Sequence, residues 1–135
     1  MVANVQPIFV RSANNAEDTH VAADGTVKKD YIVAGADGSK VFAINVCSDD
    51  TVLVNMQVFL YDGVTAYLVG TVPVPTLSGT DGIAAAVNLL DRDYIPGLDG
   101  DGELFLKFGY TIQCAPLVAV TGGKIVTVIA LGADY

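Results

Sequence analysis

The chain is poor in the residues that most often perform catalysis or bind metals. It has no tryptophan, one histidine (His20) and two cysteines (Cys47 and Cys114). A structural zinc site takes four Cys or His ligands, commonly as closely spaced pairs, and this set does not supply them. A serine or cysteine triad would have to use His20 as its base, and neither a Gly-x-Ser-x-Gly nor a Gly-x-x-x-x-Gly-Lys motif is present. We interpret His20 as a solvated residue of a polar loop, and we expect no enzymatic activity and no cofactor.

Positive charge is also scarce. Seven basic residues stand against fifteen acidic ones, which gives a net charge of -8, and the largest basic cluster is the pair Lys28–Lys29. Binding to nucleic acid requires several Lys and Arg side chains on phosphates, and an anionic membrane surface makes a similar demand. The chain has no apolar run of about 18 residues. Residues 1–7 lack the basic start and apolar core of a secretory signal. We therefore expect neither nucleic acid nor membrane as a partner.

Charged residues of both signs together make up only 16% of the chain, whereas hydrophobic residues make up 52%. An average soluble domain has about 25% charged residues. A surface with so little charge is typical of a protein that is partly covered by a partner, and a packed homo-oligomer would provide such cover. The alternative is a monomer whose surface simply has few charges.

Hydrophobic residues alternate with a period of two almost throughout, which indicates β-strands. The pattern is clearest in 52–60, where one face is formed by Val52, Val54, Met56, Val58 and Leu60. Asp62-Gly63 after it predicts a hairpin turn. Residues 11–25 are polar and are expected to form a loop. The last strand is apolar on both faces and is expected to be central in its sheet. Strands are predicted at 5–10, 26–34, 40–47, 52–60, 65–72, 83–90, 103–108, 110–115 and 124–131.

About eight strands with turn signals between them predict a single all-β domain, an antiparallel β-sandwich for which the jelly roll is one candidate arrangement. We expect residues 1–24 to form an N-terminal arm and loop and residues 25–135 to form the sandwich. Pro7 would confine the strand at 5–10 to an edge or a bulge. This segment is either an arm that reaches a neighbouring subunit or a frayed terminus.

Three acidic residues separated by glycines, Asp99, Asp101 and Glu103, are the one candidate metal site. Alternating acidic side chains can surround a calcium ion, and Asp91 and Asp93 could add oxygens. The later ligands of an EF-hand are missing. The competing interpretation is a solvated turn, because Asp and Gly are favoured in turns for backbone reasons. We prefer the turn and expect no bound metal.

Cys47 and Cys114 both lie in predicted strands. We expect two free, buried thiols in a protein made in a reducing cytoplasm, with a disulfide as the alternative if their strands are neighbours.

Tyr61, Tyr67 and Tyr94 are candidates for an exposed aromatic platform of the kind that binds sugars. Packing in the core or in an interface is the competing interpretation for each of them.

Four segments resemble a small virion protein of tailed bacteriophages, most closely a capsid decoration (cement) protein. They are 25–46 (GTVKKDYIVAGADGSKVFAINV), 61–75 (YDGVTAYLVGTVPVP), 94–106 (YIPGLDGDGELFL) and 127–135 (TVIALGADY). The resemblance implies a β-sandwich or jelly roll on the exterior of the capsid, often a homotrimer, that binds the major capsid protein and stabilises the shell. It implies synthesis in the host cytoplasm before assembly. The alternatives are another virion component, such as a head–tail or tail protein, or a glycan-binding adhesin domain.

Overall fold

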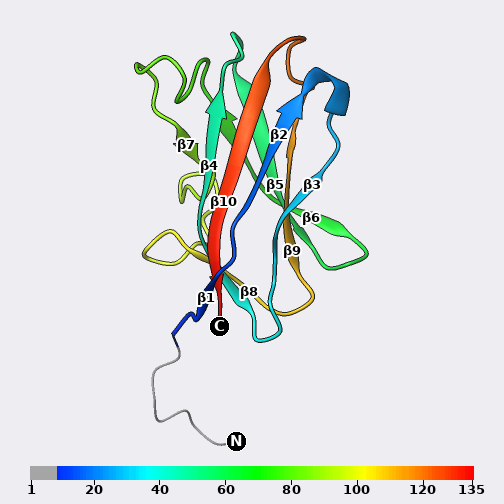
Figure 1. Ribbon diagram of the computed structural model, residues 1–135, viewed down its shortest axis with the longest axis vertical. Coiled ribbons are helices and arrows are strands. Elements are labelled where there is room, and N and C mark those ends of the chain that lie inside the picture. Colours follow the sequence, from blue (N-terminus) through cyan, green and yellow to red (C-terminus); the bar gives the residue numbers. More distant parts are fainter. Residues whose placement is uncertain (1–8) are drawn as a thin grey trace, which may run out of the picture.

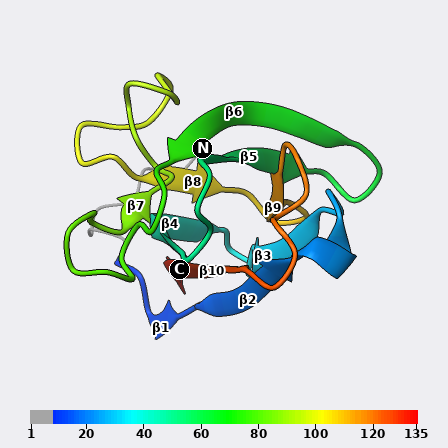
Figure 2. The same cartoon turned by 90° about the horizontal axis from the view of Figure 1, so that it is seen from above.

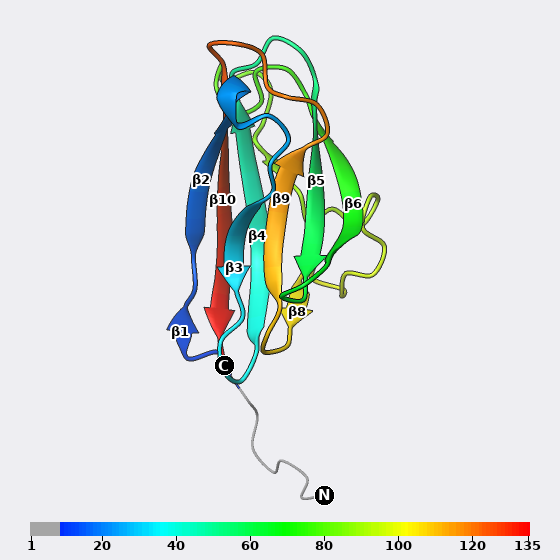
Figure 3. The same cartoon turned by 90° about the vertical axis from the view of Figure 1, so that its right-hand side faces the viewer.

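The computed structural model describes residues 9–135, and two antiparallel β-sheets pack face to face in it (Figures 1 and 3). Several of its connections gather at the two ends of the sandwich, whereas the connection between β7 and β8 runs along one side. None of its helices is long and apolar enough to cross a membrane in the part of the chain described. The elements are β1 (Ser12–Ala13), β2 (Ala16–Val21), a 3-10 turn η1 (Ala22–Asp24), β3 (Lys29–Val33), β4 (Ser39–Ser48), β5 (Val54–Tyr61), β6 (Ala66–Val74), β7 (Val87–Asn88), β8 (Leu104–Leu106), β9 (Thr111–Pro116) and β10 (Ile125–Asp134).

The strand order is that of a jelly roll. In sheet A, β10 lies between β4 and the pair β1 and β2, and the far edge of β4 pairs with β7 and β8. Sheet B has the order β3-β9-β5-β6. If β7 and β8 are taken as two pieces of one edge strand, the chain alternates between the two sheets in the strand order that defines a jelly roll. Figure 2 shows the two layers from above. The predicted all-β sandwich is confirmed, and its topology is the jelly-roll form.

The edge strand formed by β7 and β8 is interrupted by a long excursion. The piece β7 pairs with Asn45 and Val46 of β4, whereas β8 pairs with residues 39–41 at the start of that strand. Residues 89–103 leave the sheet between the two pieces and bury Leu89, Leu90, Ile95 and Leu98. Ile95 packs against Gly70 of β6, where a Cβ atom would lie 2.8 Å from its side chain. The excursion therefore closes the open side of the sandwich between sheets A and B.

The core lies between the sheets and is built by alternation along the long strands. Val54, Met56 and Val58 of β5 are buried, as the sequence predicts, and they pack with Val46 and Val128 from sheet A. Removing a side chain of this size from water stabilises the fold by about 1.5–3 kcal/mol. The same predicted face also included Val52, which precedes β5 and is exposed, and Leu60, which is half-buried. The intervening residues of β5 face outward, and among them Phe59 is buried because the ammonium group of Lys28 covers its ring.

One predicted turn and one predicted strand position are found in the structure. The turn at Asp62-Gly63 joins β5 and β6 as an antiparallel hairpin, with Tyr61 paired to Ala66. The Asp62 carboxylate accepts hydrogen bonds from the backbone N–H groups of Val64 and Thr65, which fixes this turn. The last strand, β10, has a neighbour along each of its edges and is central, as its two apolar faces predict.

Three sequence predictions of secondary structure need correction. Residues 11–25 were expected to be a loop, but β1 and β2 lie there and pair with β10. Because β2 is an edge strand with one solvent-facing side, it can be polar. It therefore lacks the apolar alternation from which the other strands were predicted. Residues 83–90 were expected to be a strand, but only Val87 and Asn88 pair. In the predicted strand 5–10, residues 5–8 lie outside the described part of the chain and Phe9–Val10 are not in a strand.

Candidate functional site

His20 is a buried core residue, which corrects its interpretation as a solvated loop residue. It lies on β2, has no solvent-accessible surface, and its Nε2 shares a hydrogen bond of 2.8 Å with the hydroxyl of Tyr31 on β3. In the described part of the chain, Nδ1 has no hydrogen-bond partner. The contact joins the edge of sheet A to the edge of sheet B, on the side opposite the excursion 89–103. The pair thus closes the second open side of the sandwich.

The electrostatic surroundings of His20 favour its neutral form. Burial lowers the pKa of His20, and the Lys29 ammonium group lowers it further, while Asp18 and Asp24 act in the opposite direction. Lys29 itself lies 3.5 Å from Asp18 and 3.1 Å from Asp24. Burial is also the main cause that raises the pKa of Tyr31. A neutral imidazole held by a phenol beneath the surface is arranged to support the fold, because no substrate can reach it without separating β2 from β3.

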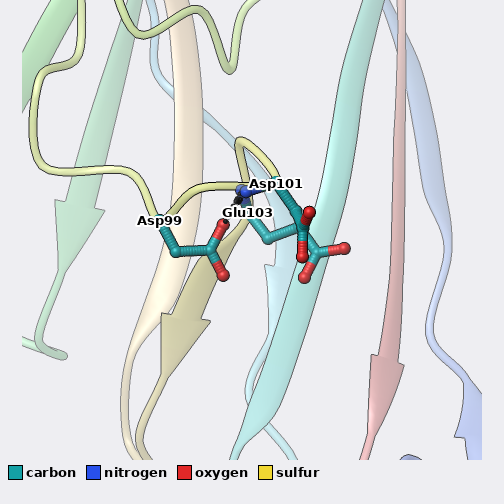
Figure 4. A group of neighbouring side chains, drawn as sticks. All are labelled: Asp99, Asp101 and Glu103. Atoms are coloured by element: carbon teal, nitrogen blue, oxygen red, sulfur yellow. Dashed lines mark hydrogen bonds between the residues drawn. The ribbon is translucent and has the colours of Figure 1, made fainter.

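The structure brings the three candidate metal ligands together. Carboxylate oxygens of Asp99, Asp101 and Glu103 lie within 4.8 Å of one another at the end of the excursion, as Figure 4 shows. An Oδ1 of Asp99 accepts hydrogen bonds from the backbone N–H groups of residues 101 and 103, at 3.0 and 2.8 Å. This is the geometry of an Asx turn, which explains the Asp-Gly-Asp-Gly sequence by backbone requirements alone.

Glu103 already has a cation beside it. Its carboxylate lies 2.5 Å from the ammonium group of Lys40 on β4, which pairs with β8 directly after Glu103. The hydrogen bond to Glu103 is the main cause that raises the pKa of Lys40. A calcium ion at this cluster would have to compete with that ammonium group for one of its three carboxylates. Asp91 lies across an open cleft from Asp101 and accepts a hydrogen bond from the backbone of Asp93.

The two cysteines are free and far apart in the topology. Cys47 was expected to be buried, but it is half-buried on the outer face of β4 in sheet A, next to Gly79. Cys114 lies on β9 in sheet B with its side chain in the core, where burial raises the pKa of its thiol to about 12. Their strands are not neighbours, so the condition for a disulfide is not met.

The three tyrosines differ in their surroundings. Tyr61 is half-buried and its hydroxyl donates a hydrogen bond of 2.9 Å to the carbonyl of Gly63. Tyr67 on β6 and Tyr94 in the excursion are exposed. Two of the three candidate aromatic residues are therefore accessible to a ligand.

Sequence reasoning missed an accessible set of aromatic rings at the end of the sandwich that holds the C-terminus. Of the chain's five phenylalanines, four are exposed and only Phe59 is buried. We call this surface the aromatic end, and it consists of Phe9, Phe42, Phe105, Phe108 and Tyr135. Figures 1 and 3 both place β1, β8 and the C-terminus at this end.

Local irregularities explain why these rings face outward. Strict alternation along 40–47 would place Phe42 on the same face as Ile44 and Val46. The pairing of β4 with β10 instead skips Phe42 in a bulge, so Val41 is buried in its place. The strand predicted at 103–108 is shorter in the structure: β8 ends at Leu106, and Phe108 lies in the following turn. The strand pattern carried no signal for either change.

The opposite end of the sandwich presents a second apolar surface, which we call the upper end: residues 49–53, 75–86 and 117–124, together with Val27. Its connections are cross-linked by Asp50, which has no accessible surface. Asp50 accepts hydrogen bonds from the backbone N–H groups of Val52 and Thr121, and its own carbonyl accepts one from Leu77. Burial acts to raise the pKa of Asp50, but these hydrogen bonds outweigh it and hold the pKa below its ordinary value. Six large apolar side chains are exposed on this framework: Val27, Val52, Leu53, Ile83, Leu117 and Val118.

Comparison with known proteins adds no assignment: no protein-family model matches the chain, and no curated protein matches it. The geometry of the described residues therefore has to support any proposal of function.

Proposed function

We propose that the chain is a structural virion protein that binds the outer surface of a phage capsid and stabilises the shell. The observation that carries this proposal is that many of its exposed apolar side chains lie at the two ends of the sandwich. Ligand pockets are mostly lined by apolar side chains around a few convergent polar groups. Here the apolar groups face outward instead, which is the property of a surface that binds other proteins.

The upper end is the surface we assign to the capsid. Leu53 is 51% exposed and Val118 is 73% exposed, on connections that Asp50 joins through hydrogen bonds. A pre-organised apolar surface loses little conformational entropy on binding. Many copies that bind a repeating lattice need only modest affinity each, because simultaneous contacts raise the overall affinity. The protein would act mechanically, by bridging neighbouring capsid subunits, and the major capsid protein is its partner.

The other properties of the chain agree with this role. A net charge of -8 keeps free copies soluble before assembly. The cysteines are free, as suits synthesis in the host cytoplasm. The resemblance of residues 25–46, 61–75, 94–106 and 127–135 to decoration proteins supports the same assignment and suggests a homotrimer on the capsid exterior.

Co-sedimentation with capsids of the phage that encodes the chain tests the proposal. We expect the protein to pellet with the capsids in a saturable way, and the double variant Leu53→Asp/Val118→Asp to remain in the supernatant. The control is Val64→Asp, which introduces a charge at an 88% exposed position in the turn between β5 and β6. If the unaltered protein stays in solution at every capsid concentration, the capsid proposal is wrong.

A second candidate is a tail, head–tail or glycan-binding component of the virion. The exposed rings of Tyr67 and Tyr94 favour the glycan-binding form, because aromatic faces commonly stack on sugars. The isolated protein would then bind specific glycans on an array, and Tyr67→Ala and Tyr94→Ala would abolish the signal. Capsid binding without glycan binding would exclude this candidate.

A further inference from the structure

The aromatic end has the features of a binding surface with a definite shape. Phe105 is 55% exposed and Phe108 is 70% exposed, on either side of the short strand-to-turn junction after β8. They line an open cleft of about 400 Å³ whose other walls include Asp37, Ser39 and Tyr135. A second cleft of about 300 Å³ begins on the other side of Phe105 and reaches Tyr110.

The rings around these clefts lie beside a half-buried ion pair. The ammonium group of Lys40 lies 5.3 Å from the centre of the Phe42 ring and 5.6 Å from that of Phe105, and it is bound by Glu103. Lys107 lies 4.9 Å from the ring of Tyr110. Cation–π contacts of this kind hold aromatic side chains in place. Binding of a partner then costs less conformational entropy, because the rings are already ordered. The surface is apolar, ordered and exposed.

The N-terminal part of the chain leaves the sandwich beside this surface. The backbone N–H of Arg11 donates a hydrogen bond of 2.7 Å to the carbonyl of Asp134, and the next residue, Tyr135, lines the cleft. Before Arg11 come Val10 and Phe9, and the Phe9 side chain is 73% exposed. Residues 1–10 contain no charged side chain, and they include Val2, Val5 and Ile8.

We propose that the aromatic end binds the N-terminal segment, residues 2–10, of a second copy of this chain. The segment and the cleft are chemically complementary. The segment carries no charged side chain, so it can pack on the exposed aromatic rings, whereas the acidic remainder of the surface cannot. Phe9 is the anchor that we expect to enter the cleft beside Phe105 and Phe108. Large aromatic side chains in desolvated pockets contribute most of the affinity of many protein interfaces.

The geometry favours a second copy over the chain's own segment. In the structure of a single chain, Phe9 and Phe108 both remain largely exposed although they lie at the same end of the sandwich. The backbone of Arg11 is fixed to the C-terminal end of β10, next to the cleft that Tyr135 lines. Exchange of segments between copies would bury Phe9 and the rings of the aromatic end. It would also join the copies into a closed ring of the kind expected for a homotrimer.

The first test is the molar mass of the full-length protein, measured by light scattering during size-exclusion chromatography. We expect a mass of two or more chains for the unaltered protein, and a mass of one chain for Phe9→Ser and for Phe105→Ser/Phe108→Ser. Val64→Ser is the matched control, because it removes an exposed apolar side chain away from both surfaces, and it should keep the oligomer. A monomeric unaltered protein, or an oligomer that survives both sets of substitutions, would overturn the proposal.

The second test separates exchange between copies from binding within one chain. Copies with Val10→Cys are mixed with copies with Lys107→Cys, both in a Cys47→Ala background, and are oxidised mildly. We expect a disulfide between the two kinds of copy. A disulfide that forms only within a chain with both substitutions, and never between copies, would contradict the proposal. Co-sedimentation of the same variants with capsids is a separate readout, so this inference can fail while the proposed function holds.

Discussion

Replacing Asp50 by alanine tests whether the upper end is held by one buried carboxylate. The substitution would remove the acceptor for the backbone N–H groups of Val52 and Thr121, at 3.1 and 3.0 Å. A buried donor left without a partner costs about 1–3 kcal/mol. Since the side chains of Val52 and Thr121 are exposed, water can reach part of this region, and the lower half of that range applies.

We therefore expect Asp50→Ala to lower the free energy of unfolding by about 3 kcal/mol, counted over two donors. For a domain of this size, that change corresponds to a fall in Tm of about 10 °C. The assay is urea denaturation followed by circular dichroism, with the slope of the transition checked for two-state behaviour.

Asp81 provides a matched control. Its Oδ1 also accepts two backbone hydrogen bonds, from Ile83 and Ala84, but the residue is exposed. After Asp81→Ala, water can replace the carboxylate, so the loss of stability should be less than half of that for Asp50→Ala. Equal effects of the two substitutions would refute the argument that burial makes Asp50 important.

Four further results are expected. Stability should fall as the pH is lowered below about 6.5, because the pKa of His20 is lower in the folded protein than in the unfolded chain, so the unfolded chain binds the extra proton. His20→Phe should remove this part of the pH dependence of urea unfolding. An unchanged pH profile in this variant would contradict the role assigned to His20. Met56→Ala should cost about 3 kcal/mol because the side chain is fully buried, while Val64→Ala should leave the urea midpoint unchanged, and a small effect of Met56→Ala would mean that the core is packed differently. Millimolar calcium should not raise Tm, because Lys40 already pairs with Glu103; a calcium-dependent rise that Asp99→Asn abolishes would restore the metal interpretation. A thiol reagent should modify Cys47 in the native protein and Cys114 only after unfolding, because Cys114 is inaccessible and its pKa is raised to about 12; rapid native reaction of both thiols would contradict the burial.

The sequence predicted the parts of the fold that depend on alternation. Val54, Met56 and Val58 define one buried face of β5, and Asp62-Gly63 places the turn after it. Such features are local, so each can be identified without knowledge of the rest of the chain. The topology required more, because the two pieces β7 and β8 become one edge strand only through their shared partner β4.

Features that depend on tertiary contacts could not be predicted in this way. His20 lies in a polar sequence, and only its pairing with β10 and its hydrogen bond to Tyr31 bury it. The exposure of Phe42 results from a bulge that the residues of β4 do not predict. The acidic cluster was found because its ligands are adjacent in sequence, whereas the aromatic end combines residues from both termini and from β4 and β8.

Immunogold electron microscopy of intact virions tests the central claim most directly. An antibody raised against the purified protein is applied to the phage that we propose encodes it, with the same phage lacking the gene as the control. We expect dense, regular labelling over the surface of the head, absent from the control. Labelling confined to the tail, or no labelling of intact virions, would contradict a capsid-binding role.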